Sequence, residues 1–283
     1  MVTLEDYGNY ETAWCPGCGN FSILKAVKQA LVASEQKPHQ VLFVSGIGQA
    51  AKEPHYLNVN LFDGLHGRSL PVATGAKLAN PNLTVVVDSG DGCNYGEGGN
   101  HFLAAIRRNI NVTLLVHNNQ VYGLTKGQAS PTSEEGFITK IHPQGVAAAP
   151  FNPIAVAVAM QTSFVARGFS GLVDHLADLI QQAIAHEGFS LVDILQPCVS
   201  FNHVNTFSWY KERCRELPPD YDPTNWEMAM KRAEEWGDTI PLGIIYRNNR
   251  PSFEKHFPTL QSGPLAGREV DQQKLTEIMD EYR

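Results

Sequence analysis

Leu83-Thr84-Val85-Val86-Val87-Asp88-Ser89-Gly90-Asp91-Gly92 is the stretch that decides the fold. Its apolar part, residues 83–88, predicts a buried strand, and the glycines of Gly90-Asp91-Gly92 let the backbone turn close to a ligand. A second apolar run, residues 112–116, ends just before Asn118-Asn119. Both polar motifs therefore follow the carboxyl ends of strands, where open parallel sheets bind their ligands.

The polar groups at these two strand ends suit a hard cation. Asp91 offers a carboxylate, Asn119 offers an amide oxygen, and main-chain carbonyl groups are nearby in sequence. Mg²⁺ takes a few such oxygens and completes its octahedron with phosphate and water. Gly-Asp-Gly alone could be an ordinary tight turn, and so could Asn-Asn, but the two motifs together favour one shared site.

The remaining pattern predicts an α/β fold, a doubly wound and mostly parallel sheet with a C-terminal extension. Helices are expected at 21–35, 71–79, 100–108 and 171–185, and further strands at 41–44 and 189–195. Such alternation places helices on both faces of a parallel sheet. Beyond a proline-rich loop at 218–223 we expect a helix at 225–236, a strand at 243–247 and a helical tail at 270–283. We therefore divide the chain into a domain at 1–215 and an extension at 216–283.

Composition and charge exclude several classes of protein. The chain has 283 residues, enough for a large core, and its net charge of −7 without Lys or Arg runs argues against nucleic-acid binding. It has no apolar stretch of about 18 residues and no basic-then-apolar N-terminus, so we expect no membrane partner and a cytoplasmic location. Five cysteines at scattered spacings suit thiols or metal ligands better than a disulfide framework.

The spacing of the two strand-end motifs resembles the diphosphate-binding motif of thiamine-diphosphate enzymes. Trp14-Cys15-Pro16-Gly17-Cys18-Gly19 narrows the resemblance to the β subunits of 2-oxoacid:ferredoxin oxidoreductases. Other stretches similar to that family are Val44-Ser45-Gly46-Ile47-Gly48, His66-Gly67-Arg68-Ser69-Leu70-Pro71, Gly98-Gly99-Asn100-His101-Phe102, Tyr122-Gly123-Leu124-Thr125-Lys126-Gly127-Gln128 and Gln196-Pro197-Cys198. They are dense over residues 10–140 and sparse afterwards.

The resemblance implies a set of cofactor ligands. Mg²⁺ would be bound by the Asp91 carboxylate, the Asn119 side chain and the Val121 main-chain oxygen. The other residues that it implies around thiamine diphosphate are Gly46, Ile47, Gly48, His66, Gly90, Gly92, Gly123, Leu124 and Thr125.

Two side chains near the expected cofactor are candidates for work on the substrate. A ring nitrogen of His66 could bond the diphosphate or the reacting carboxylate, which makes it the catalytic candidate, although a loop histidine can equally be solvated. Lys52 follows the turn that should face the cofactor. A cation there would pair with a distal carboxylate and favour 2-oxoglutarate over pyruvate, whereas the alternative is a surface lysine.

The cysteines depart from the family pattern, which implies four thiolate ligands to one [4Fe–4S] cluster. Cys15, Cys18 and Cys198 stand at three of these positions, but Gln49 occupies the fourth. Cluster iron requires thiolates, and a neutral amide is a poor substitute. Cys93 directly follows Gly90-Asp91-Gly92, where the family has an acidic residue. We therefore predict that Cys93 replaces the missing ligand. The alternative is a three-cysteine cluster or none.

Other uses of the cysteines are less consistent with the chain. Zinc would need a second closely spaced cysteine pair, and Cys198 is single. A redox dithiol at Cys15 and Cys18 would belong to another kind of fold. Cys214 lies among charged residues and resembles part of a solvated helix face.

The resemblance implies a subunit that decarboxylates a 2-oxoacid oxidatively to an acyl-CoA, or fixes CO₂ in reverse, with electrons passing through the cluster to ferredoxin. The activating glutamate and the pyrimidine-binding domain would come from an α subunit, giving an αβ heterodimer or (αβ)₂. A pyruvate-specific member, a cluster-less decarboxylase subunit and a non-catalytic scaffold remain as alternatives.

Overall fold

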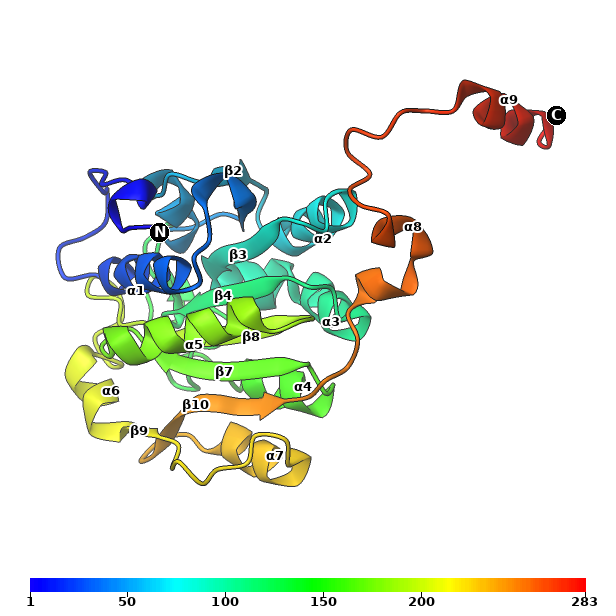
Figure 1. Cartoon of the computed structure of the whole chain (residues 1–283). Helices are drawn as coiled ribbons and strands as arrows, with labels where there is room; N and C mark the ends of the chain where they lie inside the picture. Colours follow the sequence, from blue (N-terminus) through cyan, green and yellow to red (C-terminus); the bar gives the residue numbers. More distant parts are fainter.

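The computed structural model describes residues 1–283 and is built around one eight-stranded sheet (Figure 1). Its strand order is β2-β1-β3-β4-β8-β7-β10-β9. The strands are β1 (Val41–Ser45), β2 (Asn60–Asp63), β3 (Thr84–Gly90), β4 (Thr113–Asn118), β7 (Phe164–Phe169), β8 (Ser190–Leu195), β9 (Cys214–Glu216) and β10 (Ile240–Arg247). Neighbouring strands are parallel except β7 and β10, which pair antiparallel. A small hairpin, β5 (Val121–Tyr122) with β6 (Gln128–Ala129), stands apart.

Helices cover both faces of the sheet, as the sequence predicted (Figure 1). They are α1 (Asn20–Ala33), α2 (Ser69–Ala79), α3 (Gly99–Arg108), α4 (Pro153–Ala159), α5 (Val173–Ala185), α6 (Phe207–Arg213), α7 (Trp226–Glu234), α8 (Pro258–Gln261) and α9 (Gln272–Asp280). One core cluster packs α1 and α5 against the sheet, and a second packs α2, α3, α4 and α7 against the opposite face. Every residue of β4 and β8 is buried, as expected for central strands covered on both faces.

The boundary at residue 215 does not separate a domain from an extension. β10 hydrogen-bonds to β7 within the main sheet, and α7 packs against α4. The reason is that Ile240, Leu242 and Ile245 are fully buried residues that complete the core. Only the segment from α8 onward leads away from the sheet to α9, whose residues are all exposed (Figure 1).

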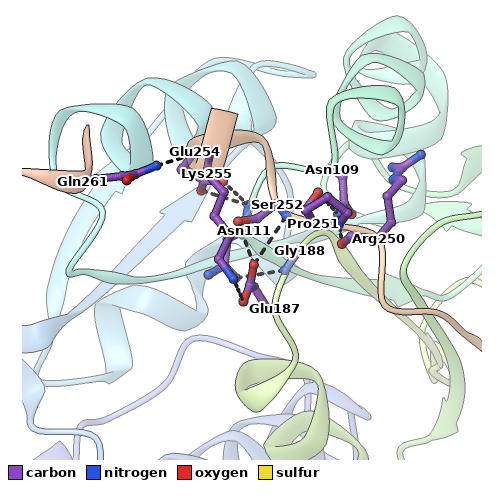
Figure 2. Close-up of polar contacts among 10 residues, drawn as sticks. All are labelled: Asn109, Asn111, Glu187, Gly188, Arg250, Pro251, Ser252, Glu254, Lys255 and Gln261. Atoms are coloured by element: carbon purple, nitrogen blue, oxygen red, sulfur yellow. Dashed lines mark hydrogen bonds and ion pairs between the residues drawn. The ribbon is translucent and has the colours of Figure 1, made fainter. Parts of the chain in front are cut away.

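The chain between β10 and α8 is fastened to loops at the amino ends of the strands (Figure 2). Asn109 has a left-handed conformation, with φ 58°, and its side-chain amide donates to the carbonyls of Arg250 and Pro251 at 2.9 and 3.0 Å. Glu254 accepts from the Asn111 main-chain amide at 3.0 Å, and Lys255 pairs with Glu187 at 2.6 Å. These contacts lie at the edge of the sheet opposite to the one that carries Asp91.

Most of the predicted elements are present, with ends shifted by a few residues. The sequence analysis shortened β10, and it missed β2, β5, β6, β7, β9, α4, α6 and α8. No helix in the structure is both long enough and apolar enough to cross a membrane.

Candidate functional site

The two strand-end motifs meet at one edge of the sheet. β3 and β4 are neighbours, with Gly90 in register with His117, so Asp91 and Asn119 follow adjacent strand ends. The chain then turns through the β5–β6 hairpin, which returns residues 130–132 toward Asp91. Three segments that are distant in sequence thus converge on one carboxylate.

Asp91 is 1% exposed and is held by two hydroxyl groups. Ser130 and Thr132 donate to Asp91 Oδ2 at 2.5 and 2.6 Å, and the other carboxylate oxygen has no side-chain partner. Burial raises the pKa of Asp91 to about 6, against the opposing effect of these two hydrogen bonds. A buried carboxylate whose second oxygen is not held by any side chain is a suitable donor for a divalent cation. Neither hydroxyl was identified from the sequence.

The pocket beside Asp91 is lined by nearly all the residues predicted to bind the cofactor. They are Ile47, Gly48, His66, Gly90, Asp91, Gly92, Asn119, Val121, Gly123, Leu124 and Thr125, and we name this the diphosphate pocket. Gly46 does not line it. Gly46 packs so closely against Cys93 that a Cβ at this position would lie 2.3 Å from the Cys93 sulfur. Asn119 Oδ1 accepts from the Val121 main-chain amide at 3.0 Å, which fixes the turn between the two residues.

The Tyr122 ring and the His66 imidazole lie side by side in one wall of this pocket, with their centroids 6.0 Å apart. A Cβ at Gly92 would lie 2.3 Å from the Tyr122 ring, so only glycine allows this approach. His66 Nδ1 lies 3.0 Å from Glu97 Oε2, and the Tyr122 hydroxyl donates to the same carboxylate at 3.2 Å. The His66 ring therefore lies close to the Glu97 carboxylate at the pocket wall, but its Nδ1 makes no hydrogen bond.

Three of the four predicted cluster ligands are brought together in a second pocket. Cys15, Cys18 and Cys198 line it with Trp14, Asn20, Gln49, Asn119, Gly123, Gln196, Val199, Ser200 and Phe201, and we name it the cysteine pocket. Burial raises the pKa of the Cys18 thiol, and the neighbouring Cys198 and Cys15 raise it further. Three neighbouring thiols, one of which is hard to ionise in this setting, suit a cation or cluster that would stabilise their thiolates.

Cys93 is not brought to these three cysteines. Its sulfur accepts a hydrogen bond from the Gly67 main-chain amide at 3.1 Å, and the residue lines the diphosphate pocket, not the cysteine pocket. The helical turn at 92–97 causes this placement, because it directs the thiol toward Gly46 and Gly67. We therefore correct the expectation that Cys93 replaces the cluster ligand missing at position 49. Gln49, at the family's fourth position, lines both pockets, and its Oε1 is buried without a hydrogen-bond partner.

Lys52 and Cys214 lie outside both pockets. Lys52 is half-buried on the 3₁₀ helix Ala50–Tyr56, two residues after Ala50, which lines the diphosphate pocket. Cys214 begins β9, and burial raises the pKa of its thiol to about 12. It is a partly buried packing residue and does not lie on a solvated helix face.

Comparison with known proteins decides the family. The family described as thiamine pyrophosphate enzyme, C-terminal TPP binding domain, matches residues 40–194, and the family of the C terminal part of the pyruvate ferredoxin oxidoreductase beta subunit matches residues 198–262. The chain is 48% identical to the 2-oxoacid:ferredoxin oxidoreductase 1 subunit beta of Aeropyrum pernix, over 83% of this chain and 77% of that one. This chain belongs to the 2-oxoacid:ferredoxin oxidoreductase β subunits.

Further relatives agree with this family. The β subunit is 43% identical to a 2-oxoacid:ferredoxin oxidoreductase subunit beta of a Sulfolobus species, over 94% of each chain. It superposes on the 2-oxoglutarate:ferredoxin oxidoreductase of Magnetococcus marinus with a TM-score of 0.91 and 33% identity, covering 98% of this chain and 96% of that one. That structure has 2-oxoglutarate, coenzyme A and succinyl-CoA bound.

Three buried polar residues of the β subunit, His117, Asp88 and Glu53, form a cluster that contacts the wall of the cysteine pocket. The sequence analysis did not identify this cluster. His117 Nε2 lies 2.7 Å from Asp88 Oδ1 and 3.7 Å from Glu53 Oε2, and all three residues are fully buried. Burial raises the pKa of the Glu53 carboxyl well above its ordinary value. His117 Nδ1 lies 2.8 Å from Asn20 Oδ1, so the group connects the end of β4 to a wall residue of the cysteine pocket.

We predict that Asp91 is a Mg²⁺ ligand and that the affinity of this β subunit for Mg²⁺ depends on the protonation of its carboxylate. The metal requires the carboxylate, and the metal-free residue has a pKa of about 6. Affinity should therefore be constant above that pH and fall by about tenfold per pH unit below it. Calorimetric titration of Mg²⁺ into the apo αβ complex with thiamine diphosphate, at a series of pH values, measures this dependence.

A Ser130→Ala variant shows whether the group that titrates is Asp91 or a phosphate of the cofactor. The Ser130 hydroxyl lowers the pKa of Asp91, so its removal should move the midpoint to higher pH. An unchanged midpoint would assign the titration to the cofactor instead.

Proposed function

We propose that this β subunit, together with an α subunit, decarboxylates a 2-oxoacid oxidatively to an acyl-CoA and CO₂, or catalyses the reverse carboxylation. Electrons would leave through one [4Fe–4S] cluster to ferredoxin. One observation carries the proposal: the diphosphate pocket and the cysteine pocket share a wall formed by Gln49, Asn119 and Gly123. A cofactor in one pocket and a cluster in the other would be near neighbours.

The residues of the diphosphate pocket fit thiamine diphosphate with Mg²⁺. Asp91, Asn119 and the Val121 carbonyl would hold the metal, while Gly90 and Gly92 leave space for the diphosphate. Bound thiamine diphosphate supplies a carbanion nucleophile and a ring that accepts electrons. His66, which lies beside Glu97 at the wall of this pocket, would position the reacting carboxylate. The aminopyrimidine and its activating glutamate are assigned to the α subunit.

The residues of the cysteine pocket fit a cluster with three thiolate ligands. Cys15, Cys18 and Cys198 would supply them, and Gln49 would face the fourth iron without a sulfur ligand. This departure from four cysteines also favours a second candidate, a cluster-less thiamine-diphosphate decarboxylase subunit. Anaerobic purification of the αβ complex distinguishes the two. A brown protein with bound iron and acid-labile sulfide supports the first, and colourless protein without either supports the second.

We further propose 2-oxoglutarate as the preferred 2-oxoacid, with pyruvate as the alternative. The support is the half-buried Lys52, whose ammonium could pair with a distal carboxylate. Lys52→Ile should lower kcat/KM for 2-oxoglutarate by about 10- to 100-fold and leave pyruvate unchanged or improved. Steady-state rates with both substrates give the comparison, with Lys140→Ile at an exposed loop position as the matched control. Equal losses for both substrates would refute a role in selection.

The remaining expectations stay predictions. They are a cytoplasmic location, an αβ heterodimer or (αβ)₂ assembly, coenzyme A as acyl acceptor, and no nucleic-acid partner. The net charge of −7 supports the last of these.

A further inference from the structure

A third cavity, of about 210 Å³, lies between α4, the end of α7 and the strands β4, β7 and β8. Asn118, Arg167 and Asp193 face it from the three strands, and Phe151, Ile154 and Trp236 contribute apolar surface. It shares no lining residue with the diphosphate or cysteine pocket. Apart from Thr132, which also holds Asp91, the proposed reaction uses none of its side chains.

Arg167 is a buried cation without an ion-pair partner. It is 2% exposed, its Nε makes no hydrogen bond, and its terminal nitrogens donate only to the carbonyls of Pro241 and Ala233, both at 3.4 Å. Asp193 is beside it in register, but that carboxylate accepts from the Tyr95 hydroxyl at 2.8 Å and from the Asn118 amide. The guanidinium also lies over the Trp236 ring, with Cζ 5.8 Å from the ring centroid. Its hydrogen-bonding capacity is therefore largely unused, and an anionic group that enters the cavity could occupy it.

The same cavity presents acceptors that lack donors. Gln120 is 3% exposed, and its Oε1 has no hydrogen-bond partner. The Glu134 carboxylate lines the cavity and accepts only from neutral donors, Trp236 Nε1 at 3.1 Å and the Asn205 amide at 3.4 Å. The cavity therefore combines one guanidinium that makes no close ion pair, one neutral acceptor without a donor, and two carboxylates, of which Asp193 is already hydrogen-bonded to Tyr95 and Asn118.

We propose that this cavity binds a small α-amino acid as its zwitterion. The carboxylate meets Arg167, and the ammonium meets Gln120 Oε1 and the Glu134 carboxylate. A simple carboxylic acid would leave Gln120 unpaired and would face Glu134, whereas a simple amine would face Arg167. Phe151, Ile154 and Trp236 contact the aliphatic side chain, and the volume of about 210 Å³ limits its size.

Calorimetric titration of L-alanine and L-leucine into the αβ complex, loaded with Mg²⁺ and thiamine diphosphate, tests the proposal. We expect saturable binding of at least one of them, unaffected by saturating 2-oxoglutarate. Propionate lacks the ammonium and L-alaninamide lacks the carboxylate, so each should bind at least about tenfold more weakly than L-alanine. Absence of saturable binding for both amino acids, equal binding of propionate, or competition with 2-oxoglutarate would each overturn it.

Two variants locate the site. Arg167→Gln should weaken binding by about 10- to 100-fold, because it removes a charge-assisted bond, and Gln120→Met by about fivefold. If the Arg167→Gln variant does not fold, Gln120→Met by itself tests the location of the site. Gln273→Met on the exposed helix α9 is the matched control and should bind normally. Wild-type affinity in folded Gln120→Met would refute the site.

Discussion

Alanine in place of Asp91 is expected to remove Mg²⁺ and thiamine diphosphate from the αβ complex and to lower its 2-oxoacid turnover by at least about 100-fold. Loss of a residue that only supports a metal ligand typically costs about 10- to 100-fold, and Asp91 is proposed as a ligand itself. Water cannot replace it easily, because the residue is 1% exposed and one carboxylate oxygen is already held by Ser130 and Thr132. Cofactor content after gel filtration and steady-state turnover measure the effect.

Asn119→Ala should act in the same direction, since it removes a second oxygen that octahedral Mg²⁺ needs at about 2.0–2.1 Å. Asp238→Ala, at an exposed position away from the site, is the matched control and should retain full cofactor and activity. Far-UV circular dichroism must show that each variant is folded. Normal thiamine diphosphate content with normal turnover in both site variants would show that the metal lies elsewhere.

The sequence was sufficient to predict the centre of this fold because local patterns determine it. The apolar runs before Asp91 and Asn119 each form a buried strand, and parallel strands necessarily bring their carboxyl ends to one edge of the sheet. The pocket residues named from short motifs then follow, because short loops cannot carry them far from the strand ends. Gly46 is the exception, and its contact with Cys93 depends on packing between two loops.

Contacts between distant segments could not be predicted in this way. Ser130 and Thr132 reach Asp91 only because the β5–β6 hairpin reverses the chain, and serine and threonine are too common for their positions to indicate it. β7 carries Arg167 and was missed, because Arg167 and two small residues interrupt its apolar run. β10 was assigned to an extension for a related reason, since its antiparallel pairing with β7 joins segments that are far apart in the sequence.

Cys93 illustrates the same limit at the scale of one side chain. The sequence could place the turns at 46–49 and 90–93 on one edge of the sheet, but not the direction of each thiol. The helical turn at 92–97 has the wider π-helical form, which the amino-acid sequence does not indicate. It leaves the sulfur of Cys93 against Gly46 and Gly67, on the diphosphate side of the wall.

The placement of the cysteines leads to the second large effect. Cys198→Ser should eliminate the cluster from the αβ complex and lower ferredoxin reduction by at least about 100-fold, because only two thiolates would remain in the cysteine pocket. Cys93→Ala should keep the iron and acid-labile sulfide of the wild type, since its thiol lies outside that pocket. Iron, sulfide and visible absorption of anaerobically purified complexes measure both outcomes.

Gln49→Cys extends this test to the fourth position. Gln49 lines the cysteine pocket, so a thiol there should provide the missing ligand and slow the loss of iron in air. Cys214→Ala, in a strand outside the pocket, is the matched control and should leave the cluster unchanged. Loss of the cluster in Cys93→Ala, together with its loss in Cys198→Ser, would restore Cys93 as the fourth ligand, and retention of the cluster in Cys198→Ser would contradict the cysteine pocket as its site. A Gln49→Cys variant no more stable than the wild type would mean that the fourth iron already has a ligand, supplied by the α subunit or by a group other than a thiolate.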